Sequence, residues 1–131
     1  MNIPFTNLGR QQTVIAKSIR KNINRVLAHN QYIFGPETEA FEERLAAVTQ
    51  VKHVVTCSSG TDALLMGLMA HDVGPGDAVF TSAFSFTAAA EVVMRLGATV
   101  VFVDIDPVSF TIDPQKLTAS IERVAQDGKL T

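Results

Sequence analysis

The sequence predicts an α/β protein with a mostly parallel sheet covered by helices on both faces. Short β-rich runs alternate with helical segments, the runs have no polar side, and 47% of the 131 residues are hydrophobic. Strands without alternating polarity are typical of parallel sheets buried on both faces, and a strand–helix alternation is the order of α/β folds.

Two helices are expected before the first strand. From Arg10 to His29, apolar residues recur at helical spacing with basic residues between them, and Asn30 is a plausible stop. Gly35-Pro36 opens a second helix, because proline suits the first helical position and the following glutamates complement the helix dipole. This helix should end near Gln50. We interpret its charged residues as a solvated face: Glu42, Glu43 and Arg44.

The remaining elements form strand–helix units. Residues 53–57 should be the first strand, followed by an apolar helix over 63–70 that we expect to be buried against the sheet. The next strand covers 78–81, and the next helix covers 88–96 with Gly97 as its stop. The third strand covers 99–103. Asp113-Pro114 then starts a last helix, with aspartate as N-cap, that runs to Asp127-Gly128.

Three parallel strands leave exposed sheet edges unless more strands or a partner chain cover them. The chain stops at Lys129-Leu130-Thr131, where a further strand would be expected. We therefore expect the 131 residues to be a fragment.

Composition disfavours several classes of protein. The formal net charge is −2 with both signs interspersed, so neither a nucleic-acid nor a membrane partner is expected. No run of about 18 apolar residues is present, and Met1–Phe5 lacks a basic region followed by an apolar run. A single cysteine, Cys57, excludes an intrachain disulfide framework and zinc-ligand spacing. A reducing, cytoplasmic setting fits best.

The loop Ser58-Ser59-Gly60-Thr61-Asp62 is the most informative local feature. Small residues between a strand and a helix expose backbone N–H groups at the positive end of the helix dipole, which suits a phosphate. The alternative is that Ser59 or Thr61 only caps the helix. The loop is neither a dinucleotide fingerprint nor a nucleotide-triphosphate loop.

Two further segments follow strands at the same sheet edge, where α/β proteins bind ligands. In the first, Phe84 or Phe86 could stack on a planar ring, or both could be core residues that close the sheet edge. In the second, Asp104 and Asp106 could contact a metal or a ribose, but Asp-Ile-Asp-Pro more often holds a turn.

The other reactive side chains favour ordinary roles. His29, His53 and His71 have no carboxylate at metal-ligand spacing, so we interpret them as surface or helix-end residues. For Cys57 we expect a buried apolar role rather than a nucleophile. No metal site is predicted.

Several motifs occur in order along the chain: Tyr32-Ile33-Phe34-Gly35-Pro36, Phe41-Glu42, Ser59-Gly60-Thr61-Asp62-Ala63-Leu64, Gly74-Pro75-Gly76-Asp77, Ser85-Phe86 and Phe102-Val103-Asp104-Ile105-Asp106-Pro107. Together, from about Ile3 to the last helix, they resemble the first third of the DegT/DnrJ/EryC1/StrS family. These are sugar aminotransferases that depend on pyridoxal 5'-phosphate and have the aspartate aminotransferase fold, known as type I. The resemblance looks closest to members that aminate a 3-keto sugar on a nucleotide diphosphate.

The resemblance implies roles for individual residues. Gly60 and Thr61, with Asp62, would hold the cofactor phosphate, and Phe86 would stack on the pyridine ring. Gly35 would line the sugar-nucleotide site. Residues 1–35 would form an N-terminal helix and a loop for substrate and dimer contacts, and 36–131 the first part of the cofactor-binding large domain. A homodimer is implied.

Catalytic residues are not expected in this chain. In the family, the lysine that binds the cofactor covalently and the acid that pairs with the pyridine nitrogen lie on later segments. The lysines present match neither position: Lys17, Lys21, Lys52, Lys116 and Lys129. Transamination needs that lysine as tether and as base, so the chain alone should have little or no activity.

The sequence therefore predicts the N-terminal part of an enzyme that moves an amino group from an amino acid, with glutamate the expected donor, to a keto sugar on a nucleotide diphosphate. Amino-sugar or polysaccharide biosynthesis would use the product. The alternative is a non-catalytic α/β module that binds a phosphate-bearing ligand or pairs with another chain.

Overall fold

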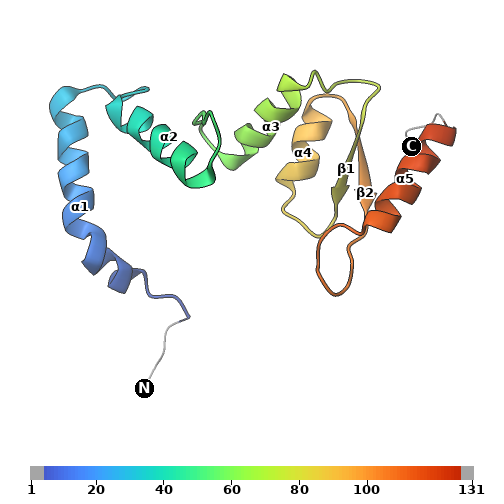
Figure 1. Ribbon diagram of the computed structural model, residues 1–131, viewed down its shortest axis with the longest axis horizontal. Helices are drawn as coiled ribbons and strands as arrows, with labels where there is room; N and C mark the ends of the chain where they lie inside the picture. The colour runs from blue at the N-terminus through green and yellow to red at the C-terminus, as the bar shows by residue number, and fades with distance from the viewer. Residues whose placement is uncertain (1–4, 128–131) are drawn as a thin grey trace. The chain divides into compact units, whose positions relative to one another are not determined.

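The computed structural model describes residues 5–127 (Figure 1). The chain divides into two compact units: unit 1 ends at Thr56 and unit 2 begins at Cys57. The expected domain boundary after residue 35 concerns the complete protein and stays a prediction. Ile3, where the family resemblance begins, lies outside the described residues. Gly128, the expected end of the last helix, lies outside them too.

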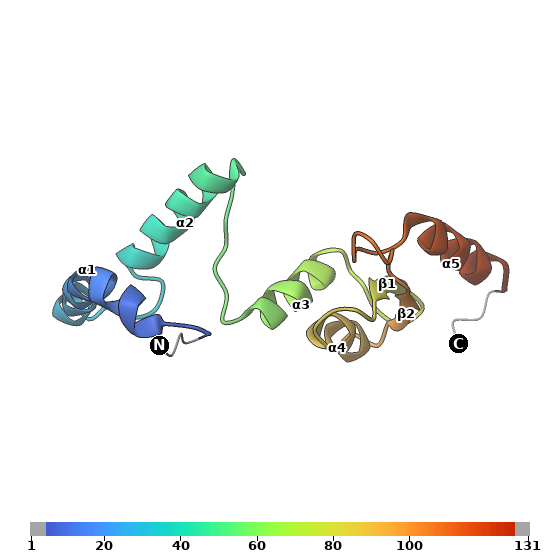
Figure 2. The ribbon, with the colours of Figure 1, turned by 90° about the horizontal axis from the view of Figure 1, so that it is seen from below.

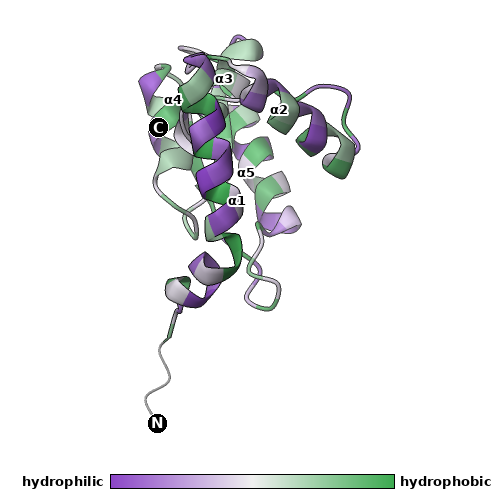
Figure 3. Cartoon of the chain, turned by 90° about the vertical axis from the view of Figure 1, so that its left-hand side faces the viewer, coloured by the Kyte–Doolittle hydropathy of each residue, from purple (hydrophilic) through white to green (hydrophobic). Residues whose placement is uncertain are grey.

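In unit 1, the first predicted helix and its stop are confirmed. Helix α1 spans Leu8–His29, and the side chain of Asn7 caps it by accepting a hydrogen bond of 3.0 Å from the backbone N–H of Arg10. Asn30 ends it in the left-handed conformation, with a φ of 59°, and donates its N–H to the Val26 carbonyl. Apolar and polar bands alternate along α1 (Figure 3).

The second predicted helix is also confirmed. Helix α2 spans Pro36–Thr49 and ends at Gln50, whose φ of 57° is again left-handed. The interpretation of Glu42 as part of a solvated face is wrong, because its half-buried carboxylate accepts hydrogen bonds from the N–H and the hydroxyl of Thr56, at 2.8 and 2.7 Å. These bonds lower the pKa of the Glu42 carboxyl.

The predicted strand over residues 53–57 is wrong. These residues form no strand, although their composition is rich in β-formers. A strand exists only where a neighbour accepts and donates its backbone hydrogen bonds. Here the N–H of Thr56 binds the Glu42 side chain instead, and no described strand lies alongside.

Unit 2 contains the sheet. Strand β1 (Ala78–Ser82) pairs in parallel with β2 (Thr99–Val103), with Ala78 opposite Thr99 and Ser82 opposite Val103. The predicted parallel pairing is confirmed, with two strands among the described residues rather than three. Helices α4 (Ala88–Arg95) and α5 (Pro114–Asp127) lie on opposite sides of the strands (Figure 2).

The core of unit 2 lies between α4, the strands and helix α3 (Gly60–Ala70). Val93 is fully buried, and Val92 and Ala98 are buried beside it. The expectation that α3 is buried against the sheet holds on one side of the helix only. Leu65 and Leu68 pack against this core, whereas the other side of α3 is exposed among the described residues.

Two predicted helix boundaries are confirmed in unit 2. Gly97 follows α4 with a φ of 77°, a conformation that glycine adopts without a steric penalty. The Asp113 carboxylate caps α5 by accepting from the N–H groups of Gln115 and Lys116, at 2.8 and 3.2 Å. Among residues 5–127, no helix is both long and apolar enough to cross a membrane.

Candidate functional site

The loop before α3 is built as a helix N-terminus that presents free donors. Ser59 is the N-cap, and its hydroxyl oxygen accepts from the N–H of Asp62 at 3.1 Å. The first N–H groups of a helix have no partner inside it, so those of Gly60 and Thr61 keep their donor capacity. The cap interpretation is thus confirmed for Ser59, and the donors available to a ligand come from the next two residues.

Asp62 holds this loop in shape. Its carboxylate accepts hydrogen bonds from the Ser58 hydroxyl and, at 3.0 Å, from the Ser59 hydroxyl. These two bonds, with a smaller contribution from the charge of Arg95, lower the pKa of the Asp62 carboxyl. The carboxylate therefore orders the N-terminus of α3 through its serine neighbours.

An open pocket brings these donors together with the predicted aromatic residue. Gly60, Thr61 and Phe86 line the same cavity, about 370 Å³ in volume, between the start of α3 and the loop before α4. Phe86 is 78% exposed, so the alternative that it closes the sheet edge as a core residue does not hold in this structure. Four further residues, for which no role was predicted, line the cavity: Leu64, Ser85, Ala88 and Ala89.

The donor set fits a phosphate group attached to a planar ring. Backbone N–H groups at a helix N-terminus, together with the Thr61 hydroxyl, are donors suited to an anion. A Cβ added at Gly60 would meet no atom within 4 Å, so the approach to this backbone is open. The exposed face of Phe86 offers a surface for an aromatic ring in the same pocket.

Gly35 lies in unit 1, just before α2. It is buried, and a Cβ at this position would collide with the carbonyl oxygen of Gln31. This close approach gives a local reason for glycine at the turn between the two helices. The predicted contact of Gly35 with a sugar nucleotide stays a prediction.

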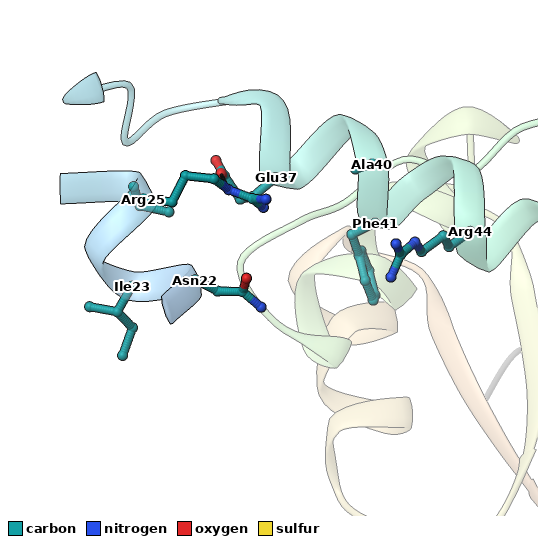
Figure 4. A pocket seen from close by; sticks show the side chains of 8 residues that line it. Asn22, Ile23, Arg25, Glu37, Ala40, Phe41 and Arg44 are labelled. Atoms are coloured by element: carbon teal, nitrogen blue, oxygen red, sulfur yellow. Dashed lines mark hydrogen bonds and ion pairs between the residues drawn. The ribbon is translucent and has the colours of Figure 1, made fainter. Parts of the chain in front are cut away.

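A second pocket, of about 410 Å³, lies between α1 and α2 (Figure 4). On its α1 side, Arg25 forms an ion pair of 2.7 Å with Glu37 of α2. Desolvation raises the pKa of the Glu37 carboxyl, but the bonds from Arg25 and His29 outweigh it and the net pKa is lowered. This pair links the last turns of α1 to the start of α2 across their connecting turn.

His29 is a helix-end residue, as predicted. Its Nε2 lies 3.0 Å from the Glu37 carboxylate, and its Nδ1 accepts a hydrogen bond of 3.0 Å from the backbone N–H of Gln31. His53 and His71 are exposed. The expectation of a buried Cys57 is wrong, because the thiol is exposed and donates to the Ser59 carbonyl.

The turn interpretation is confirmed for Asp106, whereas the Asp104 carboxylate binds the N–H of Ile105 and the side chain of Lys116. The Asp106 carboxylate accepts from the N–H groups of Val108 and Ser109, and Asp104 forms an ion pair of 2.7 Å with Lys116. The Lys116 bond lowers the pKa of the Asp104 carboxyl. Within residues 5–127, no cluster of side chains suits a metal ion.

Comparison with known proteins gives a family match over most of the chain. Residues 13–126 match the sequence profile described as the DegT/DnrJ/EryC1/StrS aminotransferase family. The UDP-2-acetamido-2-deoxy-3-oxo-D-glucuronate aminotransferase of Pseudomonas aeruginosa is 49% identical over 119 residues, which cover 91% of this chain and 33% of that protein. The chain thus spans about a third of the length of this curated relative.

Solved structures confirm the predicted fold class. A DegT DnrJ EryC1 StrS aminotransferase from Brucella abortus is 43% identical and superimposes with a TM-score of 0.94, over 98% of this chain and 35% of that one. NtdA from Bacillus subtilis, with bound cofactor PMP, is 34% identical and has a TM-score of 0.84, over 91% and 28% of the two chains. The α/β arrangement of unit 2 is accordingly part of an aminotransferase fold.

Proposed function

We propose, because the chain belongs to the DegT/DnrJ/EryC1/StrS aminotransferase family, that it forms part of an enzyme that transfers an amino group to a keto sugar. An amino acid, with glutamate the expected donor, would supply the nitrogen. The name of the Pseudomonas relative supports a 3-oxo sugar carried on a nucleotide diphosphate as the acceptor. Amino-sugar or polysaccharide biosynthesis would consume the product.

The cofactor of this enzyme would be pyridoxal 5'-phosphate, and residues of unit 2 would hold part of it. The N–H groups of Gly60 and Thr61 and the Thr61 hydroxyl would bind its phosphate, while Asp62 keeps their loop ordered. Phe86 would cover one face of its ring. When bound, the cofactor supplies the electron sink that amino-group transfer requires.

Further partners follow from family membership. Gly35 and its turn would line the sugar-nucleotide site, and two copies of the complete protein would form a homodimer. The net charge of −2 supports the absence of nucleic-acid and membrane partners. The single cysteine, present as a free thiol, supports a cytoplasmic location.

The observation that carries this proposal is the pocket shared by Gly60, Thr61 and Phe86. It unites phosphate donors and an exposed aromatic ring that are 25 residues apart in sequence, counted from Thr61 to Phe86. A helix cap alone needs no aromatic residue beside it. Donors for a phosphate and a surface for an aromatic ring, which one cofactor would need together, line the same pocket.

The test is cofactor binding by the complete protein. We expect a change in the absorbance of pyridoxal phosphate on titration, and a covalent adduct in the intact mass after borohydride reduction. With glutamate and a UDP-linked 3-oxo sugar, we expect 2-oxoglutarate to accumulate. If neither the absorbance change nor the adduct were seen, the proposal would fail and the non-catalytic phosphate-binding module would be favoured.

A matched pair of variants locates the site. Thr61→Val removes one hydroxyl at nearly constant volume and should raise the dissociation constant of the cofactor about tenfold, the value of a hydrogen bond to a charged group. Thr118→Val removes an exposed hydroxyl on α5 and should leave the constant unchanged. Equal effects of both variants would contradict the assignment of Thr61.

A further inference from the structure

An aromatic pair links two loops of unit 2. The rings of Phe84 and Phe110 lie with centroids 5.8 Å apart and planes inclined by 36°. Phe84 belongs to the loop 83–87 that carries Phe86, and Phe110 belongs to the loop 104–113 after β2. Such a separation lies within the range of favourable aromatic pairs. The contact therefore joins the Phe86 loop to a segment outside the proposed cofactor pocket.

The loop 104–113 is internally braced around Asp106. The Asp106 carboxylate accepts the N–H groups of Val108 and Ser109 at 3.0 and 2.7 Å. Its own N–H donates to the Thr111 carbonyl, and its carbonyl accepts from the N–H of Phe110, both at 2.9 Å. These four bonds fix the backbone on both sides of the Phe110 ring.

Phe110 adopts a backbone conformation that this bracing enforces. Its φ of 58° lies in the left-handed region, which is unfavourable for a bulky residue unless the surroundings hold it there. This conformation directs a ring that is 59% exposed to Phe84 instead of to the core. Phe110 thus contributes little to the core of unit 2, and its ring packs against Phe84 instead.

The loop 83–87 is anchored mainly at its ends. Next to β1, the N–H of Phe84 donates to the Ser82 hydroxyl at 3.0 Å, and at the start of α4 the N–H of Ala89 donates to the Phe86 carbonyl at 3.3 Å. Between these bonds, the Phe84 ring is 66% exposed and Phe86 78% exposed. Because Phe110 is held in place, its contact with Phe84 limits the conformations that are open to Phe86, two residues later.

We propose that Phe110 is a positioning residue, which holds Phe84 and thereby presets the Phe86 ring for stacking on the cofactor. This inference rests on the proposed function, since it concerns the same pocket. Ordering a loop in advance lowers the conformational entropy that ligand binding costs. Loss of the pair should therefore weaken cofactor binding, although Phe110 does not line the pocket.

The test is a double-mutant cycle in the complete protein. The dissociation constant of pyridoxal phosphate and the induced circular dichroism of the bound cofactor are measured for wild type, Phe110→Ala, Phe86→Leu and the double variant. We expect Phe110→Ala to raise the constant about three- to tenfold and to reduce the dichroism. In the Phe86→Leu background it should add little, because Phe110 acts through Phe86.

Controls separate this effect from a general loss of structure. Val108→Ala truncates an 85% exposed side chain in the same loop and should change neither quantity. Phe110→Tyr keeps the aromatic ring and should bind pyridoxal phosphate as the wild type does. If Phe110→Ala does not fold, Phe110→Leu, which keeps an apolar side chain but no ring, takes its place in the cycle.

The inference would be overturned if Phe110→Ala bound pyridoxal phosphate with the dissociation constant of the wild type. It would also be overturned if Phe110→Ala raised that constant by the same factor with Phe86 as with Phe86→Leu. A wild type that does not bind pyridoxal phosphate would instead overturn the proposed function.

Discussion

Units 1 and 2 are specified by different kinds of interaction. In unit 1, α1 has 22 residues and α2 has 14, yet neither contains a buried residue. In unit 2, the eight-residue α4 contains Ala88, Val92 and Val93, which are all buried. Caps end or start helices in both units, but only in unit 2 does a helix, α4, also pack into a buried core.

This difference explains which sequence signals were informative. Side chains at helix ends act within a few residues, so a cap works wherever the rest of the chain lies. Packing depends on residues that are distant in sequence, which a local pattern does not specify. The comparison predicts that the free energy of unfolding falls most when the core is altered in unit 2, and when the backbone at a turn is altered in unit 1.

The largest expected effect is in the core of unit 2. Val93→Ala removes two methyl groups from a fully buried position and should lower the free energy of unfolding by about 2.5 kcal/mol. Val14→Ala, at an 81% exposed site on α1, is the control and should change it by under about 0.5 kcal/mol. Urea unfolding of this chain, followed by circular dichroism, measures both. Equal losses would erase the distinction between the units.

The next effect concerns the backbone of unit 1. Gly35→Ala places a Cβ against the Gln31 carbonyl oxygen and should cost about 2 kcal/mol, by distorting the turn. Gly67→Ala, in the middle of α3 with no atom within 4 Å of the new Cβ, should instead gain about 0.5–1 kcal/mol. Urea midpoints that shift in opposite directions would support the comparison. A tolerated Gly35→Ala would show that the turn can relax.

A smaller, stabilising change is expected at the end of α2. Gln50 is left-handed with a φ of 57°, a conformation that glycine adopts more readily. Gln50→Gly should raise the melting temperature, with a gain in free energy of unfolding of about 0.5–1 kcal/mol. The control is Gln12→Gly inside α1, which should lower the melting temperature. A loss of stability in Gln50→Gly would mean that the Gln50 side chain matters.

The smallest effect is a pH dependence at the start of α3. Because the serine hydroxyls lower the folded-state pKa of Asp62, its contribution to stability is present above its ordinary pKa and is lost as the pH falls through the lowered value. Asp62→Asn should therefore flatten the acid limb of the stability profile. Urea midpoints between neutral pH and about pH 2 measure the difference. An unchanged acid limb would contradict this coupling.

The sequence predicted the helices and the parallel sheet because their signals are local. Asn30, Gly97 and Asp113 each end or start a helix by their own backbone or side chain, and the structure confirms all three. The apolar strands at 78–82 and 99–103 carry enough β-formers to be recognised alone.

The wrong predictions concern features that depend on residues distant in sequence. Residues 53–57 have strand composition but no described strand beside them, and Cys57 and one side of α3 are exposed among the described residues. Glu42 looked solvated because nothing near it in sequence pairs with it, yet Thr56, 14 residues later, does. For the pocket, the family resemblance already assigned Gly60, Thr61 and Phe86 to one cofactor, and in the structure these residues line one cavity.

The two hydrogen bonds of His29 assign the proton on its ring. Since Nδ1 accepts from the Gln31 amide, the proton must sit on Nε2, where it is donated to Glu37. The imidazole therefore joins the turn after α1 to the start of α2, with one ring nitrogen accepting and the other donating.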